Sequence, residues 1–142
     1  MRTIALRFGE TIAPPEGTIA VHQKIIDNNG YVWYGKFGSP VSKKVSTIIL
    51  EKDNPKILLI QSGKSKRYWA YIESIQWEEP MDGLYPSYYK QVMDRFKTWF
   101  KVIGIEEAPT DILSQCYVAS SGAVLAHASR SSMSPYFIID TE

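Results

Sequence analysis

Aromatic side chains gather in two short segments of the chain, GYVWYGKFG at residues 30–38 and RYWAYIESIQW at residues 67–77. Tyrosine and tryptophan combine a large apolar face with a polar tip. A nucleic-acid base held between such rings gains about 1–3 kcal/mol per stacked contact, whatever its identity. Methylated bases and other cationic or apolar groups suit an aromatic cage for the same reason. The two segments therefore predict a ligand site that contains Tyr34 and Tyr71.

The same rings also suit a hydrophobic core. Successive residues of a strand point to opposite faces, so Tyr31, Trp33 and Phe37 share one face and Val32 and Tyr34 share the other. One face of a strand normally packs against the core. About half of the first segment is therefore expected to be structural.

Basic residues lie in or beside the aromatic segments. Lys36 lies near the end of the first segment, and Lys64, Lys66 and Arg67 form the turn that leads into the second. A flexible turn with glycine, serine and three cations suits phosphate contacts, which would make binding depend steeply on salt. A solvated turn explains the same residues. We expect the acidic residues of these segments to lie at the opposite ends of their strands from the basic turn. These residues are Glu78, Glu79, Glu106 and Glu107.

A serine-rich segment near the end of the chain, residues 130–135, adds further donors. Arg130 and Ser132 could hydrogen-bond a base edge or a phosphate, so both are candidate ligand-binding residues. A pair of capped turns is the structural alternative for this segment.

Catalytic patterns are weak, and we expect a binding protein without cofactor or metal. A two-histidine phosphoesterase needs a hydroxyl residue two positions after each histidine. His127 is followed by Ser129 at that spacing, but His22 is followed by Lys24. The sequence contains neither a phosphate-binding Walker loop nor a dinucleotide glycine fingerprint. A single cysteine, Cys116, excludes an internal disulfide.

The elements that must position these residues are mostly strands. With 142 residues, the chain is expected to form one domain, and the net charge of +1 does not decide whether the partner is a nucleic acid. Strands are predicted at residues 1–8 (as an edge strand), 31–36, 45–51, 56–61, 67–77 and 134–140, with 45–51 and 56–61 forming a hairpin. Short helices are predicted at residues 18–28, 87–95 and 110–115, with one further turn at residues 123–129, and residues 96–105 fit a strand or a continuing helix. This pattern predicts an α+β, mostly β fold in which short strands curl into a small barrel with short flanking helices.

The order of the segments resembles the PUA-like superfamily, nearest to its EVE, YTH and ASCH branches. The resemblance rests on residues 30–36, 56–75, 96–109 and 130–138. It implies a single PUA-like domain over the whole chain. Residues 1–29 have no counterpart in it, so we expect them to form an N-terminal strand and helix extension.

The resemblance also implies a function. Many PUA-like proteins bind RNA or DNA, and the EVE and YTH branches hold a modified base in an aromatic cage. It would place Trp33 and Trp69 on the pocket-forming strands, where they would form opposite walls of a cage, with Lys64 to Arg67 at its rim. Our first hypothesis is therefore a nucleic-acid binding module that reads a modified base.

Two other functions fit the same residues. A small protein that sequesters a free nucleotide, such as a phage-type inhibitor of a nucleotide-signalling defence system, would use the same rings and cations. A protein-interaction module would use exposed rings at Tyr85, Tyr88 and Tyr89. In each case we expect a cytoplasmic protein without a membrane-spanning segment, and the sequence leaves the oligomeric state open.

Overall fold

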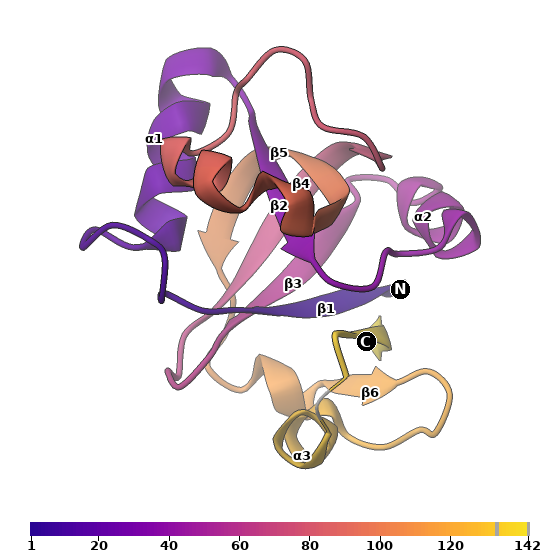
Figure 1. Ribbon diagram of the computed structural model, residues 1–142. Coiled ribbons are helices and arrows are strands. Elements are labelled where there is room, and N and C mark those ends of the chain that lie inside the picture. Colours follow the sequence, from indigo (N-terminus) through magenta and orange to yellow (C-terminus); the bar gives the residue numbers. More distant parts are fainter. Residues whose placement is uncertain (133, 142) are drawn as a thin grey trace.

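The computed structural model describes residues 1–132 and 134–141 of the chain. Figure 1 shows a strongly bent sheet with α1 and α2 at opposite sides of the view and α3 beside β6. The strands are β1 (Arg2–Phe8), β2 (Val32–Phe37), β3 (Lys56–Gln61), β4 (Arg67–Gln76), β5 (Phe96–Glu107), β6 (Cys116–Val118) and β7 (Tyr136–Thr141). The helices are α1 (Thr18–Asn29), α2 (Lys43–Leu50), α3 (Leu125–Ser131) and the 3-10 segments η1 (Ser87–Arg95) and η2 (Ile112–Ser114).

The described strands form one seven-stranded sheet in the order β2-β5-β4-β3-β1-β7-β6. β1 is parallel to β3 and antiparallel to β7. The prediction of an edge strand at residues 1–8 is therefore wrong, because β1 has a hydrogen-bonded neighbour on each side. The strands at the two ends of the order are β2 and β6.

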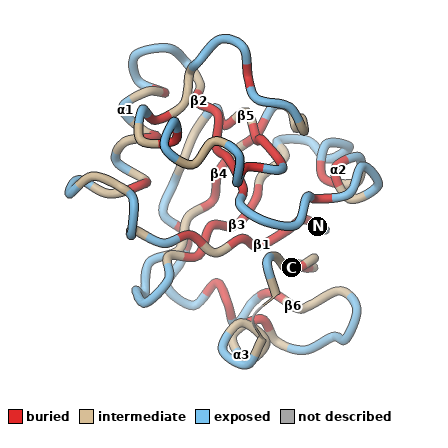
Figure 2. Tube along the Cα trace, viewed as in Figure 1, coloured by how far each residue is buried: buried red, intermediate tan, exposed pale blue. Residues whose placement is uncertain are grey.

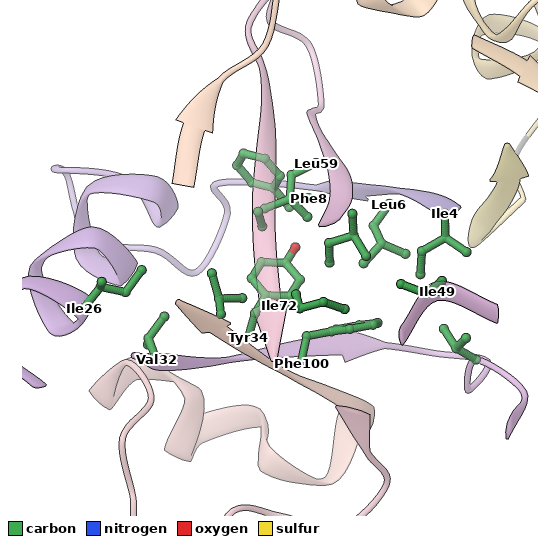
Figure 3. Close-up of a cluster of buried hydrophobic side chains, with 14 residues drawn as sticks. Ile4, Leu6, Phe8, Ile26, Val32, Tyr34, Ile49, Leu59, Ile72 and Phe100 are labelled. Carbon is green, nitrogen blue, oxygen red and sulfur yellow. The ribbon is translucent and has the colours of Figure 1, made fainter. Parts of the chain in front are cut away.

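The sheet curls around its main hydrophobic core. β1 and β2 are separated by three strands in the sheet order, yet Leu6 and Phe8 of β1 share one buried cluster with Val32 and Tyr34 of β2. Figure 3 shows these side chains converging from different strands. The strand-rich α+β class is thus confirmed. A closed barrel is not, because the strand pairs of the described residues run from β2 to β6 without joining the two.

The helices cover what the curled sheet leaves open. Ile26 of α1 and Ile49 of α2 both pack into the main core. The other face of the sheet carries two smaller clusters, one beside η1 and one beside η2 and α3. In Figure 2 the buried trace follows the strands at the centre of the molecule, while most connecting loops are exposed. β2 therefore lies between two buried layers.

The helix predicted at residues 18–28 is confirmed, as are the strands in the two aromatic segments. Gly30 ends α1 in the left-handed conformation, with φ of 90°, and its N–H donates to the Ile26 carbonyl oxygen at 2.7 Å. Residues 96–105 belong to strand β5, which settles the alternative left open above.

The strand predicted at residues 45–51 is wrong, because residues 43–50 form helix α2. Its β-branched residues favour a strand locally, but the Ser42 side chain caps a helix by accepting from the Val45 N–H at 3.2 Å. Ser46 and Ile49 are then buried on one helical face. Packing against the core therefore outweighs the local preference.

Candidate functional site

A pocket of about 120 Å³ lies where β1 and β2 approach each other across the curled sheet. We call it the seam pocket. Residues of β1, β2, η1 and the first turn of α1 line it, and its aromatic lining residues are Phe8, Tyr34, Phe37, Tyr88, Tyr89 and Phe96. Its charged lining residues, among those described, are the cations Arg7 and Lys36. The pocket is therefore an aromatic recess with positive charge in its wall.

Tyr89 is held in the seam pocket by a buried hydrogen-bond chain. His22 Nδ1 lies 2.7 Å from the Thr18 carbonyl oxygen, which can only accept, so Nδ1 carries the proton. His22 Nε2 then accepts from the Tyr89 hydroxyl at 2.9 Å, and the Gly35 N–H donates to the same hydroxyl oxygen. Burial lowers the pKa of His22 to about 4 and raises that of Tyr89 well above its usual value. Both groups are therefore neutral at pH 7, and the Tyr89 ring is fixed.

Gly35 makes room for another ring of the seam pocket. A Cβ atom at this position would lie 2.4 Å from the Phe96 ring, so only glycine lets that ring rest against β2. Phe96 in turn stacks on Phe37, with ring centroids 4.8 Å apart and planes 17° from parallel. Phe37 is 42% exposed and remains accessible from outside.

Two of the predicted ligand-binding residues, Tyr34 and Lys36, line the seam pocket. Tyr34 is buried, and this burial raises the pKa of its hydroxyl. Lys36 is also buried, and its Nζ donates to the carbonyl oxygens of Phe37 and Ser39. Burial lowers the pKa of Lys36. Among the described residues its ammonium group has no carboxylate within ion-pairing distance.

The structure does not bring Trp33 and Trp69 together. Trp33 is buried in the cluster beside η1, and its indole N–H donates to Asp82 at 3.3 Å. Trp69 is buried in the cluster beside η2 and α3, where Lys56 Nζ lies 4.3 Å from its ring centroid. Neither tryptophan lines the seam pocket. Tyr71 packs near Trp69, and its hydroxyl donates to Glu106.

A second recess of about 650 Å³ lies between the β3–β4 turn, η2 and α3, and we call it the basic groove. Lys64 of the turn and Arg67 at the start of β4 meet Arg130 of α3 there, although they are more than 60 residues from it in sequence. Arg7 of β1 also lines it, and this residue was missed by the sequence analysis. Its position between the inward-facing Leu6 and Phe8 is the signal that places Arg7 on the other face of the sheet.

Lys66, the third predicted phosphate contact, does not line the groove. Its ammonium group lies 3.7 Å from the Glu107 carboxylate. The expectation that Glu106 and Glu107 lie far from the basic turn is wrong, because the antiparallel register pairs Tyr68 with Glu107. This end of β5 therefore places negative charge on one side of the turn.

Ser132 lines neither recess, and its hydroxyl lies 2.8 Å from that of Ser134. Met133, which belongs to the segment that resembles PUA-like proteins, lies outside the described residues. The rings proposed for a protein-interaction surface are largely covered. Tyr89 is buried, and Tyr85 and Tyr88 are half-buried against the same aromatic cluster.

The described part of the chain contains no group of three or more histidine, cysteine or acidic residues that could hold a metal ion. None of its helices has the length and apolar character needed to cross a bilayer.

A family model described as Pua-like matches residues 4–136. The match includes most of residues 1–29, which the resemblance noted in the sequence did not cover. Comparisons with curated proteins and with solved structures give no match.

Proposed function

The chain belongs to the Pua-like family, and we propose that it binds a nucleic acid by holding one base in the seam pocket. Pua-like domains are generally binding modules for nucleic acids or modified bases. The observation that carries the proposal for this chain is the concentration of six aromatic residues around one recess that has no described carboxylate in its lining. Aromatic faces bind any base by stacking.

The charges of the seam pocket favour a neutral base over a cationic one. Arg7 and Lys36 are positive, and Thr18, Tyr34 and Tyr88 carry hydroxyl groups. Such donors suit the carbonyl oxygen and ring nitrogen acceptors of bases. A base with a permanent positive charge would meet like charge in the wall. We therefore expect selectivity for an uncharged base, with an added apolar group tolerated by the rings.

Substitution of one accessible ring tests this proposal. Tyr88 is half-buried and lines the seam pocket, so Tyr88→Ala removes a stacking surface without emptying the core. We expect it to weaken binding of single-stranded oligonucleotides about tenfold or more, since one stacked base contributes about 1–3 kcal/mol. Fluorescence anisotropy with plain and methylated RNA and DNA strands measures the effect.

Tyr117→Ala is the matched control, because this half-buried tyrosine lies on β6 at the far end of the sheet order. Circular dichroism checks that both variants remain folded. Equal affinities of the wild-type protein and Tyr88→Ala for every strand would contradict the proposal, as would an equal loss in both variants.

A further inference from the structure

The basic groove and the seam pocket share Arg7 in their linings, so the two recesses are neighbours. We propose that the basic groove binds the phosphodiester backbone of a nucleic-acid strand whose base occupies the seam pocket. This inference rests on the proposed function and narrows it, because the ligand is then a single strand and not a free nucleotide.

Charge is the first argument. Arg7, Lys64, Arg67 and Arg130 line the groove, and Asp111 is its one described acidic lining residue. The ion pairs recorded among the described residues involve other cations, namely Arg2, Lys66 and Lys101. The groove cations therefore keep their charge available for an anion. These cations come from β1, the β3–β4 turn, the start of β4 and α3. The fold therefore brings together charges that are far apart in the sequence.

Unused hydrogen-bond donors are the second argument. Nε of Arg67 is buried, and it has no hydrogen-bond partner among the described residues. A buried donor left without a partner destabilises the state that holds it. Among the described residues, Arg130 Nη2 lies 3.1 Å from His127 Nδ1 and pairs with no carboxylate. Guanidinium groups match phosphate oxygens in geometry and charge, so Arg67 and Arg130 in the groove lining suit a phosphate ligand.

Size is the third argument. The groove holds about 650 Å³ against about 120 Å³ for the seam pocket. A nucleoside monophosphate whose base fills the pocket carries phosphate at a single position. A groove several times larger than the pocket suits the phosphates and sugars of flanking nucleotides. A base can enter a protein pocket only when it is unstacked, which favours a single strand.

Charge reversal in the β3–β4 turn tests the inference with a built-in control. Lys64→Glu and Lys66→Glu change the net charge equally and lie two residues apart, but only Lys64 lines the groove. We expect Lys64→Glu and Arg130→Glu to weaken binding of a twelve-nucleotide strand at least about tenfold, and Lys66→Glu to have a much smaller effect. Each lost phosphate contact should reduce the slope of log K against log salt by about 0.7.

Equal losses of affinity in Lys64→Glu and Lys66→Glu would contradict backbone binding in the groove, because the effect would then follow net charge alone. Unchanged affinity and salt slope in Lys64→Glu and Arg130→Glu would overturn it as well. Competition by poly-glutamate as strong as that by an abasic strand would show that the groove takes an acidic peptide. RNA and DNA strands of one sequence show whether the 2′-hydroxyl contributes.

Three probes separate failure of the groove from failure of the base pocket. In the first outcome, a nucleoside monophosphate binds as tightly as the strand, and Tyr88→Ala weakens this binding. This result would refute backbone binding in the groove and would leave base binding in the seam pocket standing. An abasic strand that binds as tightly as the complete strand, in a manner sensitive to Lys64→Glu, supports the groove and refutes the base pocket. Tighter binding of the complete strand than of either fragment supports both.

Discussion

His22 is an unusual histidine, because both ring nitrogens are used inside the protein. One bonds the Thr18 carbonyl and the other bonds Tyr89. The imidazole therefore joins α1 to η1 and holds one ring of the seam pocket. The ring is buried and neutral. Protonation of Nε2 would remove the acceptor that bonds the Tyr89 hydroxyl, so this link depends on the neutral form of His22.

We expect acid to destabilise the protein through His22. The pKa of His22 is about 4 in the folded protein and about 6.5 when exposed, so the unfolded chain takes up the proton first as the pH falls. The contribution of neutral His22 to the free energy of unfolding is fully present above pH 6.5. It falls by about 3 kcal/mol between pH 6.5 and 4. Urea unfolding across this range measures it.

The protein contains one other histidine, which supplies the control. His127 is exposed on α3. His22→Gln should remove the extra pH dependence below pH 6.5, because the amide does not titrate, whereas His127→Gln should retain it. Identical pH profiles of the wild-type protein and His22→Gln would contradict this account.

At the residue level, the sequence indicated which residues could bind a ligand, but not how they assemble. Tyr34 and Lys36 line one recess, and Lys64, Arg67 and Arg130 line another, so one predicted site is divided between two recesses, and the role of these residues in binding stays a prediction. Local patterns could not show that Trp33 and Trp69 lie in different clusters, because that depends on which helix covers each strand. Local patterns also could not show that Tyr89 of η1 is buried and Tyr88 half-buried.

β2 depends on a glycine at the point where Phe96 crosses it. We expect Gly35→Ala to destabilise the fold by about 1–3 kcal/mol, because the new methyl group would overlap the Phe96 ring. Gly104→Ala is the control, since its Cβ would lie 4.0 Å from the Tyr71 ring, at ordinary van der Waals distance. Thermal unfolding of the two variants makes the comparison.

Combining Gly35→Ala with Phe96→Leu tests the cause of this loss. If overlap with the ring is responsible, Gly35→Ala should cost less in the Phe96→Leu background than in the wild-type protein. Additive losses would show that Gly35 matters for another reason.

The elements differ in how far local sequence determines them. α1 and β4 carry clear periodicity and clear stop signals, so their type follows from the sequence alone. α2 is short and rich in β-branched residues, and its helical state depends on the Ser42 cap and on burial of Ile49. The burial of β2 on both faces could not be foreseen, because it requires η1 to fold back over Trp33.

For the whole molecule, residues 1–8 are part of the central sheet. β1 lies between β3 and β7, and it supplies Ile4, Leu6 and Phe8 to the main core. We expect deletion of residues 1–8 to abolish cooperative unfolding, because β3 and β7 would lose their common neighbour together with three buried side chains. Circular dichroism melting measures the outcome. A cooperative transition near the wild-type temperature would show that this segment is dispensable.

The pairing of β1 with β7 also affects how the protein folds during synthesis. β1 can pair with β3 once residue 61 is present, but its other edge waits for residues 136–140. At about 5–20 residues per second, the ribosome needs about 4–15 s to make the intervening chain. For that time, unpaired main-chain groups of an apolar strand can join other chains. Newly made copies of this protein should therefore depend on chaperones more than copies of a protein whose strands pair with neighbours close in sequence.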